Sequence, residues 1–391
     1  MKKKLLLPLA LVIMVIPMSI KAQGLSNYSF GKGLKVKAED GSFEMKFSTR
    51  FQTLYLGELN LETNNYSDQM LIRRARLKFD GFAFSEKLVY KIELGISNRD
   101  TRNSSTGGLP QHSGTSNIIL DAVIKYKFAK GWELWFGQTK LPGNRERVIS
   151  SQKLQFVDRS LVNSRFNIDR DLGLQLRRSL KLGNVGLKLI GSIAVGEGRD
   201  ITSRNPGGYD YTGRIELLPF GEFSNKGDYF ASDLEREEKP KLSIGITGDY
   251  NDGAVRRGGQ LGGFVVDTEG NQLQSDLSAI FVDAIFKYKG FSFASEFASK
   301  GGDNVQGFRT GSGFVAQAGY LFNSNFEPAF RYTVIEADNR FSALSNQTEY
   351  TLGFSRYFSG HNLKVQTDFS YSDFAEGDDE FRYRLQMEVS F

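Results

Sequence analysis

Three cationic side chains recur at every second position of the segment MLIRRARLKFDG, residues 70–81. Arg74, Arg76 and Lys78 share one parity, so in an extended strand they face the same side. Because same-side residues of a strand are about 6.6 Å apart, the three form a row of positive charge about 13 Å long. Such a row attracts anions, and the planar guanidinium group of arginine matches the oxygens of a phosphate. The spacing therefore predicts a path for anions, provided that this side of the strand faces water.

Further cations fall on the equivalent parity of their own segments and extend the predicted anion path. They are Arg50, Lys125 and Lys127. Acids such as Glu93 and Asp121 also fall on inward positions, so cross-strand ion pairs that keep a lumen hydrated are the alternative role for any single cation. Cations outnumber these acids by a small margin, which predicts a modest preference for anions. Arg73 has the opposite parity, and we expect it near a membrane interface.

These charges need strands to present them, and alternation of apolar and polar residues recurs along the chain. The last segment, FRYRLQMEVSF, places aromatic and aliphatic residues at odd positions and polar residues at even positions. Sixteen such segments occur, at 43–52, 70–81, 88–96, 118–128, 131–140, 172–180, 185–195, 211–219, 241–250, 278–289, 291–299, 313–322, 326–336, 349–358, 363–371 and 381–391. Each has about ten residues, the length of a tilted strand that crosses a bilayer.

The pattern predicts an all-β fold, a transmembrane antiparallel β-barrel of about 16 strands formed by residues 43–391. The 32 Phe and 16 Tyr residues fit aromatic girdles at the two interfaces of a membrane. An exported soluble β-sandwich, with one solvated face on its sheet, is the alternative. After residue 23 the chain has no run of about eighteen apolar residues, so we expect no transmembrane helix.

The links between segments alternate between short and long, as expected of a barrel with short periplasmic turns and long extracellular loops. Segment 56–69 is predicted as the first long loop. The third, 141–169, contains apolar residues at helical spacing and five cations, which are Arg145, Arg147, Lys153, Arg159 and Arg165. We expect this loop to fold into the lumen and narrow the pore, with packing over the outer mouth as the alternative. Residues 221–240 exceed a short turn, and we expect either an extended periplasmic turn or an unrecognised pair of strands.

The first 22 residues have the features of a secretory signal peptide: a lysine cluster, an apolar run and a small residue, Ala22. We expect cleavage after Ala22, which leaves 23–42 as a periplasmic N-terminal segment ahead of the barrel. Loss of the peptide removes its four lysines, so the formal net charge falls from +5 to +1. This small charge gives no support for nucleic-acid binding.

Residues that could support catalysis or metal binding are sparse. The chain has no cysteine, and His112 and His361 have no flanking Ser and Asp in a catalytic arrangement. The acid pair Asp378-Asp379 falls on a loop, where adjacent carboxylates are usually solvated. We therefore predict that the protein is not an enzyme and needs no metal or other cofactor.

The chain ends on an aromatic residue, which has two consequences for a barrel. Phe391, Val389 and Met387 share the lipid-facing parity and resemble the signal by which the barrel-assembly machinery recognises outer-membrane barrels. The last strand must also pair with the first, because a barrel in a membrane leaves no open edge. We expect this strand to be the closing seam, with Arg382 and Arg384 in the pore wall.

Four stretches of the chain carry a family resemblance. They are RRARLKFDG, LVYKIELGIS, GQTKLPGNRERVISSQKLQFVDRSLV and FNIDRDLGLQL. They resemble the phosphate-selective porin O and P family of outer-membrane channels, which implies a barrel of about sixteen strands, usually a homotrimer, with the third extracellular loop in the pore. By position, the family's basic strand matches Arg74, Arg76 and Lys78, and its loop matches Arg145, Arg147 and Arg159. Residues 141–170 depart from the phosphate-specific members, because they contain no tyrosine.

The first functional hypothesis is an outer-membrane porin, a passive diffusion channel for small anions such as phosphate. Its expected partners are these anions, outer-membrane lipid, the barrel-assembly machinery and further copies of the chain in a homotrimer. No nucleic-acid partner is expected. The alternative is an outer-membrane barrel that acts as a surface-binding or adhesion protein through its long loops.

Overall fold

The computed structural model describes residues 29–97, 100, 118–199, 201, 205, 207–338 and 342–391. The predicted signal peptide, its cleavage site and His112 lie outside these residues. No helix within the described ranges is long and apolar enough to cross a membrane.

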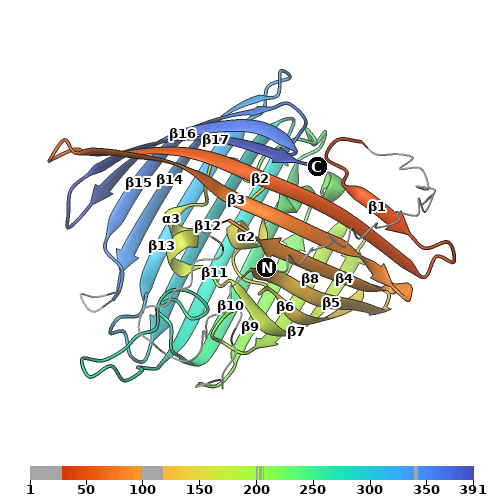
Figure 1. Ribbon diagram of the computed structural model, residues 1–391, viewed down its shortest axis with the longest axis horizontal. Helices are drawn as coiled ribbons and strands as arrows, with labels where there is room; N and C mark the ends of the chain where they lie inside the picture. Colours follow the sequence, from red (N-terminus) through yellow and green to blue (C-terminus); the bar gives the residue numbers. More distant parts are fainter. Residues whose placement is uncertain are drawn as a thin grey trace, which may run out of the picture.

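Sixteen long antiparallel strands of the described residues, β2 to β17, form a closed barrel (Figure 1). The strands are β2 (Phe43–Asn60), β3 (Tyr66–Ala83), β4 (Ser85–Gly95), β5 (Ile119–Ala129), β6 (Trp132–Lys140), β7 (Arg170–Leu182), β8 (Val185–Ala194), β9 (Asp210–Leu218), β10 (Lys241–Ala254), β11 (Ser275–Tyr288), β12 (Phe291–Gly302), β13 (Gly311–Tyr320), β14 (Phe326–Ala337), β15 (Gln347–Tyr357), β16 (Leu363–Phe374) and β17 (Glu380–Ser390). Consecutive strands pair along the chain, and β17 pairs with β2 to close the ring. The predicted fold class is confirmed.

Alternation along each strand separates the two faces of the wall. In β9 the exposed positions include Tyr211, Ile215 and Leu217, whereas Thr212 and Arg214 between them are buried. Apolar side chains on the outside suit lipid, and polar side chains inside suit a hydrated lumen. Closure pairs the backbone of every strand, which is the condition for a sheet to cross a membrane.

A β-bulge in β3 changes the parity that the sequence suggested. Gln52 of β2 lies opposite Arg74, but the next residue of β2, Thr53, lies opposite Ile72, so Arg73 is an extra residue. Arg73 consequently turns into the lumen and forms an ion pair with Asp158 at 2.9 Å. The expectation that Arg73 lies near an outer interface is wrong, because strict alternation fails at a bulge.

The predicted first long loop, 56–69, is mostly strand. β2 continues to Asn60 and β3 begins at Tyr66, so only residues 61–65 link them. Both strands are 18 residues long and extend beyond the other strands of the wall. The many polar residues of this stretch suggested a loop because a strand that projects into water needs no apolar face.

Two segments fold into the barrel and supply its apolar core. The inserted loop, residues 141–169, contains α2 (Arg145–Val148) and α3 (Leu161–Phe166), which lie inside the barrel (Figure 1). Val162 and Phe166 of α3 pack against Phe281 and other apolar residues of the inner wall. The periplasmic segment, residues 219–240, joins β9 to β10 and contains the 3-10 helix η2 (Ser224–Tyr229). It is an extended turn folded inward rather than a pair of strands.

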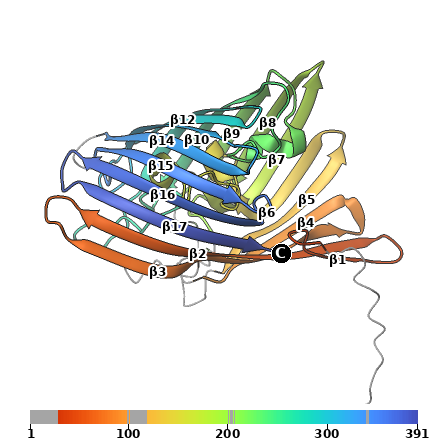
Figure 2. The same cartoon turned by 90° about the horizontal axis from the view of Figure 1, so that it is seen from above.

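The seam of the barrel involves both ends of the described chain. Phe391 exchanges two backbone hydrogen bonds with Thr49, at 2.8 and 2.9 Å, directly after the last pair of β17 with β2. The short strand β1 (Leu34–Lys37) then pairs with the start of β2. β17 and β1 thus cover successive parts of one edge of β2 (Figure 2).

Candidate functional site

The lumen contains a large cavity of about 910 Å³. One side of it is the inner wall formed by β2 to β8, and the other side is formed by the inserted loop and the periplasmic segment. Among the described residues, seventeen Lys and Arg side chains line the cavity, against six Asp and Glu side chains. This excess of positive charge in a confined space concentrates small anions.

The opposite half of the wall carries acids, but the inserted segments cover them. Asp283, Glu296, Glu327, Glu349 and Asp368 are each at most 3% exposed. The partner of each acid is either a donor group of an inserted segment or an arginine side chain of the wall. Lumenal charge is therefore segregated into an open cationic half and a filled half where the acids are buried against polar or charged partners. A count of inward cations and acids over the whole sequence averages the two halves, so it underestimates the excess of positive charge in the open half.

Arg50 and Arg74, two residues of the predicted anion path, lie where the wall meets the inserted loop. Arg74 donates to Asp158 Oδ1 of the loop at 2.7 Å and to a glutamine of β2 at 2.8 Å. Arg50 donates to Ser151 Oγ of the loop at 2.8 Å and lies 3.3 Å from Glu388. Both arginines are more than nine-tenths buried, so they attach the loop as well as lining the cavity.

Arg76 and Lys78, the rest of the predicted row, also have carboxylate partners. Arg76 forms ion pairs with Glu93 at 3.4 Å and Asp100 at 2.8 Å. Lys78 lies 2.8 Å from Asp80. The Arg76–Glu93 pair is the cross-strand pairing that the alternative role predicts, whereas the Lys78–Asp80 pair lies within β3. The role of the row in anion passage stays a prediction.

Lys125 and Lys127 differ from these paired cations. Both line the cavity, and no carboxylate oxygen of the described residues lies within 4.0 Å of either ammonium group. Lys125 Nζ instead lies 3.7 Å from the ring centroid of Trp135, and the guanidinium of Arg177 lies 3.8 Å from the same centroid. These unpaired charges are the ones most available to an anion.

Four of the predicted cations of the inserted loop divide into two groups. Arg147, Lys153 and Arg159 line the cavity. Arg145 does not, because its guanidinium faces the wall, where Nε donates to Asp283 at 2.6 Å. Arg159 donates to two backbone carbonyls of its own loop, at 2.8 and 2.6 Å. Arg147 forms an ion pair with Asp169 at the end of the same loop. The loop thus carries cations to the cavity on a framework held by its own hydrogen bonds.

Lys153 and Asp158 are among the titratable groups of the inserted loop that have shifted pKa values. Burial lowers the pKa of Lys153 to about 8, helped by the positive charges of Lys78 and Lys226. Burial opposes ionisation of Asp158, but Arg73 and Arg74 outweigh it and hold the pKa of this carboxyl well below its usual range. Asp158 is therefore a fixed anion that attaches the loop, and Lys153 is a cation that titrates close to neutral pH.

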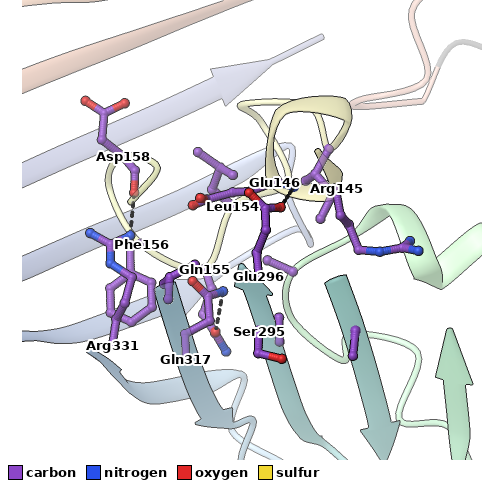
Figure 3. A pocket seen from close by; sticks show the side chains of 15 residues that line it. Arg145, Glu146, Leu154, Gln155, Phe156, Asp158, Ser295, Glu296, Gln317 and Arg331 are labelled. Atoms are coloured by element: carbon purple, nitrogen blue, oxygen red, sulfur yellow. Dashed lines mark hydrogen bonds between the residues drawn. The ribbon is translucent and has the colours of Figure 1, made fainter. Parts of the chain in front are cut away.

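The far side of the inserted loop is bonded to β12, β13 and β14 (Figure 3). Glu296 accepts a hydrogen bond from the backbone N–H of Glu146 at 3.1 Å, Gln317 donates to Gln155 at 3.3 Å, and Arg331 donates to the Asp158 carbonyl at 2.9 Å. A cavity of about 30 Å³ remains between loop and wall, large enough for a water molecule. The loop is therefore a fixed constriction rather than a free lid over the outer mouth.

The periplasmic segment narrows the cavity from the other end, and sequence reasoning did not assign it this place. Lys226, Tyr229 and Phe230 line the cavity. Lys188 of the wall lies 2.5 Å from Asp228, and Lys287 donates to two backbone carbonyls of the segment, at 2.9 and 2.6 Å. The signal in the sequence is the aromatic content of the stretch GDYF, which a solvated turn does not need.

The closed barrel with an apolar outer face, a polar lumen and a loop folded inside has the fold of an outer-membrane porin. The chain matches the family described as phosphate-selective porin O and P over residues 47–223, which confirms the resemblance seen in the sequence. The matched part runs from β2 into the periplasmic segment, so it includes the cationic half of the wall and the inserted loop. The family that matches is one of channel proteins. Within the described ranges, no group of three or more His, Asp or Glu side chains could hold a metal ion.

Three relatives show how far the likeness extends. An uncharacterised protein of Aquifex aeolicus (strain VF5) is 22% identical, over 89% of this chain and 87% of its own length. The anion-selective porin of Comamonas acidovorans has a TM-score of 0.59 at 12% identity, covering 89% of this chain and 99% of that one. The trimer form of OmpT from Vibrio cholerae has a TM-score of 0.52 at 10% identity, covering 88% and 99%. At these identities the two solved structures establish the fold alone.

Proposed function

We propose that this porin is a passive diffusion channel for small anions, phosphate among them. The observation that carries the proposal is the composition of the open cavity, where cations outnumber acids seventeen to six. A pore lined by Arg and Lys lowers the electrostatic barrier for anions and raises it for cations. The neighbour that bears the name anion-selective porin supports the same selectivity.

The proposed path follows the cations that have no carboxylate partner among the described residues. Lys125, Lys127 and Arg177 mark the wall, and Lys153 and Arg159 mark the inserted loop. In this scheme Arg50, Arg74, Arg76 and Lys78 add to the field while they hold the wall and loop together.

The assembly of the channel is proposed on the same basis. Residues 1–22 direct export, 23–42 form the N-terminal segment on the periplasmic side, and 43–391 form the porin domain in outer-membrane lipid. Phe391, Val389 and Met387 are proposed as the signal for the barrel-assembly machinery, and the trimer form of the Vibrio cholerae neighbour supports a homotrimer.

Planar-bilayer recording of the purified protein tests the function. In a KCl gradient the reversal potential is expected to show preference for chloride, and added phosphate is expected to reduce the chloride current. Preference for potassium would overturn the proposal. Absence of conductance steps would favour the surface-binding alternative.

The row on β3 needs its own test. Arg74→Glu with Arg76→Glu is expected to lower anion preference and weaken block by phosphate, as measured by reversal potential and chloride current. Because this change places acids against Asp158 and Glu93, Lys127→Glu is the matched control, which reverses a charge without breaking an ion pair of the described residues. If only Lys127→Glu changes selectivity, the β3 row belongs to the scaffold.

A further inference from the structure

Trp135 lies between two cations on neighbouring strands of the cationic wall. Lys125 of β5 is directly opposite Trp135 of β6 in the register. Arg177 of β7 is two residues from Gln175, which is the partner of Trp135 on the other side. The two charges lie 3.7 and 3.8 Å from the indole centroid, within the range of a cation–π interaction. All three side chains line the open cavity.

The indole and the guanidinium are held in place by their own hydrogen bonds. Trp135 Nε1 donates to Glu133 Oε2 at 2.7 Å, which fixes the ring. Arg177 Nε and Nη2 both donate to Gln175 Oε1, at 3.2 and 2.8 Å. Arg177 Nη1 and Lys125 Nζ have no hydrogen-bond acceptor among the described residues. The arrangement therefore leaves donors from two cations free, on a rigid base, beside the cavity.

Two positive charges beside one ring repel each other, and no carboxylate oxygen of the described residues lies within 4.0 Å of either. The indole face compensates in part, because its negative quadrupole attracts both. An anion in the cavity compensates further by accepting hydrogen bonds from the free donors. Glu133, the acid opposite Arg177 in the register, accepts the hydrogen bond of Trp135 Nε1. The free donors of the two cations therefore remain available to a mobile anion.

We propose that Lys125 and Arg177 form a binding site for a small oxyanion, and that Trp135 is the positioning residue that holds both cations toward the pore. The site deepens the proposed function and rests on it. The ligand class follows from the donors. Gln175 occupies the Nε edge of the guanidinium and leaves the edge formed by Nη1 and Nη2. This edge matches the oxygens of carboxylates and of phosphate alike, so both classes of anion fit. Phosphate and succinate are therefore expected to bind within about tenfold of each other.

The chain allows a spectroscopic test, because it has only two tryptophans. Trp132→Phe leaves Trp135 as the single tryptophan, whose emission can be excited selectively. Titration of this variant in detergent with phosphate or succinate, against chloride at equal ionic strength, is expected to change the Trp135 emission saturably. Lys125→Gln with Arg177→Gln in the same background is expected to abolish the change. No saturable change in Trp135 emission, or an equal change in the variant that lacks Lys125 and Arg177, would overturn the proposed site.

The positioning role of Trp135 needs a measurement that a purely structural role of the ring would leave unchanged. Trp135→Phe keeps an aromatic face and is expected to retain phosphate block of the chloride current, while Trp135→Leu is expected to weaken it about fivefold, within the range of a cation–π contact. Phe136→Leu, on the exposed outer face of the same strand, is the control and should change nothing. Equal block in Trp135→Phe and Trp135→Leu would exclude positioning by the ring.

The two measurements separate the site from the channel. Saturable emission changes without anion-selective current would reject the proposed function and keep the site. Anion-selective current without emission changes would reject the binding site and keep the proposed function.

Discussion

At the scale of individual residues, Lys153 of the inserted loop is a cation whose charge changes close to neutral pH. Its pKa is lowered to about 8 by burial and by the nearby charges of Lys78 and Lys226. Because the lysine is charged below that pKa and neutral above it, anion preference is expected to fall as pH rises from 7 to 9. Reversal potentials across this range measure the effect. Lys153→Arg stays charged and should show a smaller fall; the same fall in the variant would assign the titration elsewhere.

Asp158 gives the second prediction at this scale, because it joins the inserted loop to the wall. Its folded-state pKa is depressed, so its contribution to stability is complete above the unfolded value of about 4 and is lost as pH falls toward the folded pKa. Asp158→Asn is expected to lower the free energy of unfolding at neutral pH by about 3 kcal/mol. Urea unfolding at several pH values measures this. An unchanged acid dependence in Asp158→Asn would contradict the assignment.

The sequence predicted which residues face the lumen better than it predicted their partners. Parity alone placed Lys125 and Lys127 inward, because alternation is a local property of a strand. It failed for Arg73, where a bulge adds a residue to one strand. It could not show that Arg74 is paired and Lys125 unpaired, since Asp158 and Trp135 reach these cations only through the loop and the sheet register.

At the scale of elements, all sixteen barrel strands were predicted, and the inward folding of residues 221–240 was not. The strands repeat a local pattern, whereas the position of the segment depends on contacts with distant strands. Lys287 of β11, for example, donates to its carbonyls from inside the lumen. Length and aromatic content marked the segment as unusual without indicating which way it folds.

Shortening this segment tests its part in the constriction. Replacement of residues 224–236 by a tight Asn-Gly turn is expected to raise single-channel conductance, because the cavity loses the side chains that narrow its periplasmic end. Anion preference should fall as well, because acids such as Glu327, which Ser232 of the segment bonds at 2.7 Å, become open to the lumen. Shortening the external turn 375–379 is the control. Unchanged conductance would place the constriction at the inserted loop alone.

For the whole molecule, the two halves of the lumen have different electrostatic roles. Cations of the open half face the cavity, and several lack a carboxylate partner among the described residues. In the filled half, acids hold several of the cations: Arg384, for example, is paired with Asp368 at 2.6 Å. Because a paired charge is largely cancelled at the distance of a passing ion, selectivity should depend on where a cation lies rather than on the total lumenal charge.

A pair of single neutralisations distinguishes these two possibilities. Lys127→Gln removes an unpaired charge of the open half, and Arg382→Gln removes a charge that pairs with Glu349 in the other half. Glu349 keeps Arg331 as a partner at 3.6 Å, so the second variant leaves no isolated carboxylate. Anion preference in a KCl gradient is expected to fall for Lys127→Gln and to stay close to the parent value for Arg382→Gln. Equal shifts would mean that the pore responds to its total charge, and the division of the lumen into two halves would have no functional consequence.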